Sequence, residues 1–218
     1  MKKTILALIM AFAFIPAAFA FFLDVNENHK NYKAIKYMKD QDIITGYSDG
    51  RFRPDDSVNR VELLKMIIES QPNDFTLSSS DASCFTDVNE GEWYAPYACY
   101  AKKNGWVKGY KDNSFKPNAK LNKAEAVKII LLSYGLRSDS YKYSSFVDVD
   151  ENEWYFGYIE KAVEQGIVDD DGDYFNPAKS VTRAEVSQFI YNAVFSNDYL
   201  EIMSGEIKRK GVSTEVSR

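Results

Sequence analysis

Three copies of one sequence unit constrain the fold of this chain more than any other feature. The copies begin at Phe22, Phe85 and Phe146 with the motif F-x-D-V, and an aromatic residue, a proline and a glutamate follow in the same order. The first two copies have identical internal spacing, and the third is one residue shorter in its central loop. A unit of about 50 residues buries too little apolar surface to be very stable alone. We therefore expect the three copies to pack together and to share one core.

Each copy has the residue pattern of a helix, a loop and a second helix. Apolar residues three positions apart predict the first helices; they are Ile35 and Met38, Ala98 and Ala101, and Ile159 and Ala162. Turn residues and a proline follow, and the proline stands where it cannot interrupt a helix. The second helices carry one apolar face each: Leu63, Met66 and Ile67; Ala126, Ile129 and Ile130; Val186, Phe189, Ile190, Ala193 and Val194. The pattern predicts a mainly α-helical fold with the three second helices in a central bundle.

The repeats also divide the chain into segments. The three copies occupy residues 21–70, 84–135 and 145–195, and polar connectors join them. Residues 1–20 have the features of a secretory signal peptide: a charged MKK start, an apolar run and the cleavage motif AFA. We expect this segment to be removed on export, which leaves no apolar run long enough to span a membrane. Residues 196–218 have weak periodicity and predict a short helix that passes into a flexible tail.

Charge and motif content argue against several classes of function. The formal net charge is −5, and it becomes −7 without the two lysines of residues 1–20. Because nucleic-acid binding relies on lysine and arginine to neutralise phosphates, we expect no nucleic-acid partner. The acidic clusters at the F-x-D-V motifs lack the ligand spacing of a calcium-binding EF-hand loop. The chain also lacks a nucleophile elbow, a P-loop and a dinucleotide fingerprint, so we expect no metal, no cofactor and no catalytic centre.

The chain has two cysteines, Cys84 and Cys99. An isolated pair in an exported protein is typical of a disulfide, and two cysteines with one histidine are too few for a zinc site. We expect a bond that ties the start of the second copy to its first helix. The alternative is a pair of buried thiols.

A cation stands at the first position of each second helix. Capping boxes predict the helix starts: Asn59 with Glu62, Asn122 with Glu125, and Thr182 with Glu185. Arg60, Lys123 and Arg183 come next, where a positive charge opposes the helix dipole. A cation beside free helix N-terminal amides would form an anion site. The alternative is an exposed cation, or an ion pair with the motif aspartate of a neighbouring copy.

Aromatic pairs precede the first helices of two copies: Trp93 with Tyr94, and Trp154 with Tyr155. Their ring faces would suit the apolar faces of sugar rings. The interpretation that we favour is that these residues lock the first helix into the shared core. The first copy carries Lys30 and Asn31 at these positions and lacks the pair in either case.

Together these motifs make the chain similar to the S-layer homology (SLH) domain family. The resemblance rests on F-x-D-V, GYSDGRFRP and VTRAE with their order and spacing, and it covers nearly the whole chain after residue 20. It implies three repeats in a pseudo-threefold, three-pronged helical bundle that is monomeric. It also implies a secreted, non-enzymatic module that holds proteins at the bacterial cell surface. Its partner would be an anionic, often pyruvylated, cell-wall polysaccharide or another peptidoglycan-linked glycan, bound in grooves between the prongs.

The resemblance further implies which residues bind the glycan. They are Arg60, Lys123 and Arg183; Asp24, Asp87 and Asp148; and Gly46 and Gly109. Trp93 and Trp154 are added as candidate ligand-binding residues from the sugar-stacking alternative, not from the resemblance. The third copy has a deletion near Asp170, and the second has lysine in place of arginine, so we expect the groove at Arg60 to bind most tightly. Two alternatives remain open at this point: a structural surface protein whose repeats mediate protein–protein assembly, and a small envelope enzyme.

Overall fold

The computed structural model describes residues 21–72, 84–138, 140–170 and 172–209. The expected signal peptide and the last part of the expected tail lie outside these residues. The described helices are α1 (Tyr32–Asp40), α2 (Arg60–Glu69), α3 (Ala95–Lys103), α4 (Lys123–Ser133), α5 (Phe156–Glu164), α6 (Arg183–Val194) and α7 (Asn197–Arg209). The described residues otherwise contain loops and isolated β-bridges, which confirms a mainly α-helical fold. None of the described helices has the length and apolar character that a membrane crossing requires.

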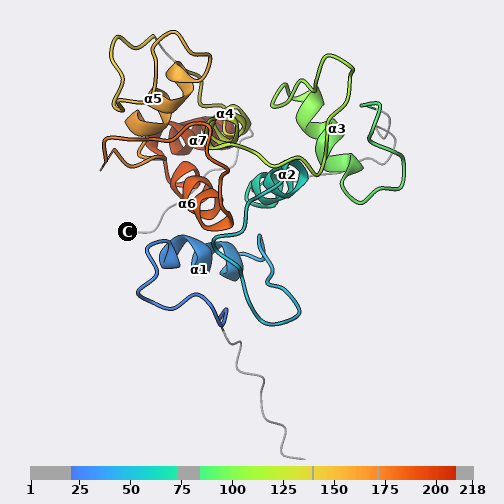
Figure 1. The fold of residues 1–218 in the computed structure, drawn as a ribbon. Coiled ribbons are helices and arrows are strands. Elements are labelled where there is room, and N and C mark those ends of the chain that lie inside the picture. The colour runs from blue at the N-terminus through green and yellow to red at the C-terminus, as the bar shows by residue number, and fades with distance from the viewer. Residues whose placement is uncertain (1–20, 73–83, 139, 171, 210–218) are drawn as a thin grey trace, which may run out of the picture.

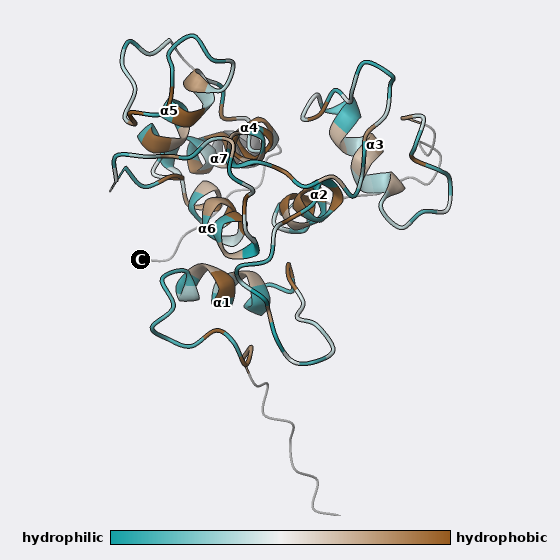
Figure 2. Ribbon diagram, viewed as in Figure 1, coloured by the Kyte–Doolittle hydropathy of each residue, from teal (hydrophilic) through white to brown (hydrophobic). Residues whose placement is uncertain are grey.

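The second helices of the three units, α2, α4 and α6, lie together at the centre of the molecule (Figure 1). Residues on their inner faces, such as Leu63, Ile130 and Ile190, have no exposed surface. The remaining repeat helices, α1, α3 and α5, lie outside this centre and form three prongs. Figure 2 shows hydrophilic residues along much of the loops of the prongs. The predicted central bundle and three-pronged arrangement are therefore confirmed.

The three units interlock in a closed ring. Each prong helix packs against the central helix of the preceding unit, so that α3 contacts α2, α5 contacts α4, and α1 contacts α6. Three backbone hydrogen bonds close the ring just before the central helices: Val58 N to Val181 O at 3.1 Å, Leu121 N to Val58 O at 3.2 Å, and Val181 N to Leu121 O at 3.0 Å. Because α1 of the first unit packs on α6 of the third, the ring is closed, and each unit obtains part of its core contacts from another unit.

The aspartate of each F-x-D-V motif anchors the loop of its own unit. The carboxylate oxygens of Asp24 accept hydrogen bonds from the N–H groups of Phe52 and Arg53 at 2.8 and 2.7 Å. Asp87 and Asp148 make the same pair of contacts to their own loops. Arg53 has a φ of +58°, which is uncommon for a residue other than glycine, and the charge-assisted hydrogen bonds help to hold this turn. The alternative of an ion pair between these aspartates and the cations at the helix starts is therefore wrong for the described structure.

Cys84 and Cys99 are bonded, with their Cα atoms 5.3 Å apart, which confirms the predicted disulfide. The bond joins the segment before Phe85 to α3. It therefore fixes the start of the second unit to its prong helix, at the point where the described chain resumes after residue 72.

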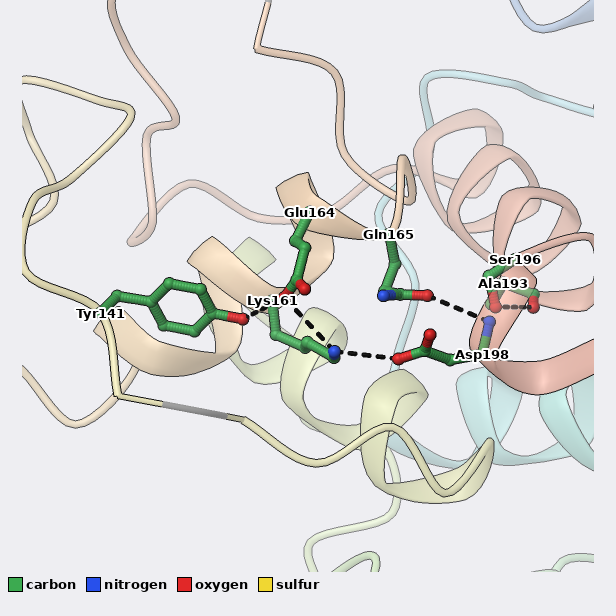
Figure 3. Close-up of polar contacts among 7 residues, drawn as sticks. All are labelled: Tyr141, Lys161, Glu164, Gln165, Ala193, Ser196 and Asp198. Atoms are coloured by element: carbon green, nitrogen blue, oxygen red, sulfur yellow. Dashed lines mark hydrogen bonds and ion pairs between the residues drawn. The ribbon is translucent and has the colours of Figure 1, made fainter. Parts of the chain in front are cut away.

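Helix α7 folds back against the third unit. The Nζ of Lys161 on α5 lies 2.9 Å from Asp198 Oδ2 on α7 and 3.3 Å from Glu164 Oε2 (Figure 3). Tyr199 is buried and packs edge-on against Tyr134 at the end of α4, with ring centroids 4.8 Å apart. The sequence predicted a short helix in this region, and the structure has one of 13 residues that is docked on the bundle.

Candidate functional site

The N-termini of the central helices have no free amide for an anion within the described residues. In α2, the capping box uses the amides of the N-cap and N3 residues, as the sequence predicted. The N–H groups of Arg60 and Val61 donate to Ala119 O and Pro117 O in the next unit, at 3.0 and 3.3 Å. The N-termini of α4 and α6 are closed in the same way. The interpretation that these amides form an anion site is therefore wrong, and a bound anion would have to be held by side chains.

A pocket of about 440 Å³ lies beside Arg60, and we call it the Arg60 groove. All three units line it: Arg60 from the first, Tyr110 and Lys128 from the second, and Trp154 from the third. The volume falls within the range of about 300–1,000 Å³ that is typical of small-molecule sites. The groove exists because the prong helix of one unit packs across the central helix of another.

Arg60 is a buried cation that has no ion-pair partner among the described residues. The residue is 8% exposed, and its Nε donates to Phe115 O at 2.8 Å. Its guanidinium lies over the rings of Phe115 and Tyr110, 4.7 and 5.4 Å from their centroids. Burial lowers the pKa of Arg60, but an arginine remains charged in proteins. The N–H groups of the guanidinium that do not bond Phe115 O are therefore suited to an anionic ligand.

The tryptophans of the second and third units lie at the surface. Trp154 is 50% exposed and Trp93 is 56% exposed, so the interpretation that they lock the prong helices into the core is wrong for them. Tyr94 and Tyr155, which follow them, are the residues that pack against the core. The Nζ of Lys128 lies 4.9 Å from the centroid of Trp154. The Arg60 groove thus has an exposed aromatic face next to two cations.

The surroundings of Arg183 largely repeat those of Arg60, with one added contact, in which Arg183 Nη2 donates to Thr45 O at 3.5 Å. Arg183 Nε donates to Phe52 O at 2.9 Å, and the guanidinium lies over the rings of Phe52 and Tyr47 at 4.6 and 5.3 Å. The Nζ of Lys65, on the central helix α2, lies 5.9 Å from the centroid of Trp93, which belongs to the neighbouring prong. We call these residues the Arg183 site; they are the pseudo-threefold counterpart of the Arg60 groove.

A second pocket, of about 430 Å³, lies beside Lys123, and we call it the Lys123 groove. Lys123 Nζ lies 3.7 Å from Glu185 Oε1, so this cation already has an acidic neighbour. Burial lowers the pKa of Lys123, and Glu185 acts in the opposite direction. Lys30 stands at the position that Trp154 has in the Arg60 groove, and Asp169 adds a second carboxylate to the lining. The Lys123 groove therefore has the same place in the fold but different chemistry.

Gly46 and Gly109 each allow the loop of their unit to pass close to the phenylalanine of that unit's F-x-D-V motif. A Cβ atom at Gly46 would lie 2.6 Å from Phe22 Cε1, and one at Gly109 would lie 2.5 Å from Phe85 Cε1. No side chain fits at these distances, so glycine is required for the close approach. Gly109 also lines the Arg60 groove.

Five residues around Arg60 and Arg183 were not singled out from the sequence: Tyr47, Tyr110, Lys65, Lys128 and Tyr158. Both lysines stand three residues after a capping glutamate, which places them one helical turn further along the same face. Both loop tyrosines follow the required glycines. A search for residues that recur at one position in two copies but not in all three would have found them.

Comparison with known proteins places the chain among bacterial surface proteins. The model of the family described as "S-layer homology domain" matches residues 21–64, 85–127 and 145–187. S-layer protein sap of Bacillus anthracis is 29% identical over 178 residues, which cover 81% of this chain and 21% of that protein. The cellulosome-anchoring protein of Acetivibrio thermocellus is 30% identical over 153 residues, covering 67% of this chain and 32% of that protein. The middle cell wall protein of Brevibacillus brevis is 26% identical over 163 residues, covering 74% of this chain and 14% of that protein. The chain thus spans less than a third of the length of each of these relatives.

Proposed function

Because the chain belongs to the S-layer homology domain family, we propose that it is a non-enzymatic module that attaches non-covalently to the bacterial cell envelope. Its ligand in this proposal is an anionic wall polysaccharide, such as one that carries pyruvate. The observation that carries the proposal is the Arg60 groove, in which a buried arginine without an ion-pair partner among the described residues lies beside an exposed tryptophan. The relatives whose names refer to the S-layer, the cell wall or cellulosome anchoring support the same location.

The groove suits a sugar that carries a carboxylate. The free N–H groups of Arg60 would bind the carboxylate, and Lys128 would add a second positive charge. The exposed face of Trp154 would pack against the apolar face of the sugar ring. The Arg183 site offers the same set of residue types, so two equivalent contacts on one glycan chain would add avidity.

The structure also supports a ranking in which the Arg60 groove binds more tightly than the Lys123 groove. Lysine lacks the planar fork of arginine, and Lys123 already lies near Glu185. An Arg60→Ala change should remove a charge-assisted contact of about 1.5–3 kcal/mol. This corresponds to a loss of about tenfold or more in affinity. The Lys123→Ala change should lower the affinity for the glycan by a smaller factor.

Two measurements test the proposal. Purified wall sacculi should sediment the protein, and acid extraction of the polysaccharide should abolish sedimentation. Calorimetry with a soluble wall oligosaccharide should then show weaker binding for Arg60→Ala and for Trp154→Ala. Among the described residues the side chain of Trp154 donates no hydrogen bond to a backbone carbonyl, whereas Arg60 Nε donates to Phe115 O. Weaker binding by Trp154→Ala would therefore not result from the loss of a contact between units. If both variants bind like the parent protein, the Arg60 groove is not the glycan site.

The same experiment separates the proposal from the alternative of protein–protein assembly. A protein that assembles without glycan would form lattices or larger particles in its absence. The ring of three units closes within one chain, because α1 packs on α6, and this supports a monomer. Sedimentation of the free protein as a monomer, together with glycan-dependent binding to sacculi, would exclude assembly as the primary role.

A further inference from the structure

The Lys123 groove contains a buried hydrogen-bond acceptor that has no partner among the described residues. Asn31 lies just before α1, is 7% exposed and lines this groove. Its Oδ1 is buried and accepts no hydrogen bond from the described part of the chain. A buried polar atom that has no hydrogen-bond partner destabilises the folded state. Such an atom at the wall of a pocket indicates a ligand group or a water that completes it.

A chain of side-chain amides determines that this free atom is an acceptor. Asn192 Nδ2 donates to the backbone carbonyl of Ile167 at 3.1 Å, and a carbonyl oxygen can only accept. Asn192 must therefore turn its Oδ1 toward Gln188, whose Nε2 donates to it at 2.8 Å. Gln188 in turn presents Oε1 to Asn31, whose Nδ2 donates at 3.3 Å. Because the carbonyl of Ile167 can only accept, the orientations of all three side-chain amides are fixed. Asn31 Oδ1 is then the one acceptor of these three amides without a partner among the described residues, so the group that completes it must be a hydrogen-bond donor.

The charge balance of the Lys123 groove favours anions less than that of the Arg60 groove. Three cations and one carboxylate line the Arg60 groove, whereas three cations and two carboxylates line the Lys123 groove. Gln188 stands where Lys128 stands in the Arg60 groove, which replaces a cation with a neutral amide. The central cation, Lys123, is also near an acid of its own, Glu185.

We infer that the Lys123 groove binds an uncharged sugar unit, which donates a hydrogen bond from an O–H or N–H group to Asn31 Oδ1. This inference rests on the proposed function, because it divides one glycan between two kinds of groove. The arginine at position 60 holds the anionic unit, and the amide chain that ends at Asn31 holds a neutral unit. The protein therefore selects a glycan that contains both an anionic and a neutral sugar unit, and negative charge alone is not sufficient.

The test uses NMR of the ¹⁵N-labelled protein with two forms of one probe. The probe is a soluble oligosaccharide released from purified walls, either native or with its carboxylates chemically reduced to alcohols. The native form should shift the indole N–H signal of Trp154 and the side-chain amide signals of Asn31 and Gln188. The reduced form should lose the effect at Trp154 and keep the effect at the two amides. If the reduced form leaves the amides unshifted, the inference is wrong.

An Asn31→Leu variant gives a second readout. It keeps the number and branching of the side-chain heavy atoms, and it removes the acceptor together with the Nδ2 donor to Gln188. Affinity for the reduced oligosaccharide should therefore fall by about fivefold, as expected for one neutral hydrogen bond to the ligand. The response of Trp154 to the native form should stay as in the parent protein. A variant that binds the reduced form as tightly as the parent would overturn the inference. If the variant does not fold, the NMR comparison of the parent protein decides alone.

The two proposals fail in different ways. If the native oligosaccharide shifts neither Trp154 nor the amides, the proposed function itself is wrong. If it shifts Trp154 alone, glycan binding stands and the assignment of the Lys123 groove falls. If the amides respond to the native form but not to the reduced one, the Lys123 groove is an anion site like the Arg60 groove.

Discussion

Exchanging arginine and lysine at the starts of the central helices should change stability in opposite directions. Arg60 and Arg183 each donate an Nε hydrogen bond to a phenylalanine carbonyl of the next unit in the ring, at 2.8 and 2.9 Å. Lys123 has no such bond: its Nζ lies over the ring of Phe175, 4.6 Å from the centroid. In the described part of the chain no donor reaches Phe175 O. The Lys123→Arg change should therefore supply the missing bond, and Arg60→Lys should remove an existing one.

The expected magnitudes follow from the surroundings of each cation. A hydrogen bond to a charged group contributes about 1.5–3 kcal/mol, and Arg60→Lys should lose most of this because a buried carbonyl loses its donor. Lys123→Arg should gain less, about 1 kcal/mol, because the new side chain gives up part of the contact with Glu185. In a protein of this size each kcal/mol shifts the melting temperature by about 2–4 °C. The first variant should melt about 3–12 °C lower and the second about 2–4 °C higher.

Chemical denaturation of the parent and the two variants measures these changes directly, and the slope with denaturant shows whether the unfolded state has changed. A Lys65→Arg variant is the matched control, since it makes the same chemical change on α2 away from the helix start. If Lys123→Arg is no more stable than the parent while Arg60→Lys is unchanged, the inter-unit carbonyl bonds do not hold the ring together. The reasoning would also be refuted if the control gained as much as Lys123→Arg.

Three further predictions concern contacts outside the grooves. Reduction of the bond between Cys84 and Cys99, which are 15 residues apart, should lower the free energy of unfolding by about 3 kcal/mol in the chain-entropy model, as denaturation with and without reductant would show. Burial, and then the hydrogen bond to Glu69, raise the pKa of Tyr97 from 10.0 to about 12. The contribution of Tyr97 to stability is therefore present below pH 10 and is lost as the pH rises toward 12. In denaturation at a series of alkaline pH values, Tyr97→Phe should lose stability less steeply than the parent protein. Asp198→Asn should speed hydrogen exchange in α7 and leave glycan binding unchanged, and equal exchange rates would mean that the ion pair does not dock this helix.

Local features of this fold could be predicted from the sequence because they depend on residues near one another in the chain. The capping boxes formed as expected because the N-cap and N3 residues are only three positions apart, as at Asn59 and Glu62. The disulfide followed from the presence of two cysteines in an exported chain. The apolar faces of the central helices followed from their period, so residues such as Ile67 and Ile130 were placed in the core correctly.

Contacts between units could not be predicted in this way, because their partners are far apart in the sequence. Nothing near Arg60 indicates that its own amide is bonded to Ala119 O, so the helix start looked free when it is closed. The exposure of Trp93 and Trp154 likewise depends on which central helix each prong crosses. An apolar residue before a helix fits a core position or a groove wall equally well, and only the ring arrangement distinguishes the two.

The closed ring also determines how binding can be dissected. Arg60, Lys128 and Trp154 come from three different units and meet only when the ring is complete. A fragment with one unit therefore contains no groove, and its failure to bind would say nothing about the role of its cation. Multivalency has to be removed inside the intact chain instead, by changing Trp93 at the Arg183 site and leaving the Arg60 groove whole. If the glycan is held at both sites, this variant should bind wall fragments less tightly than the parent and should bind a short oligosaccharide at the Arg60 groove with unchanged affinity.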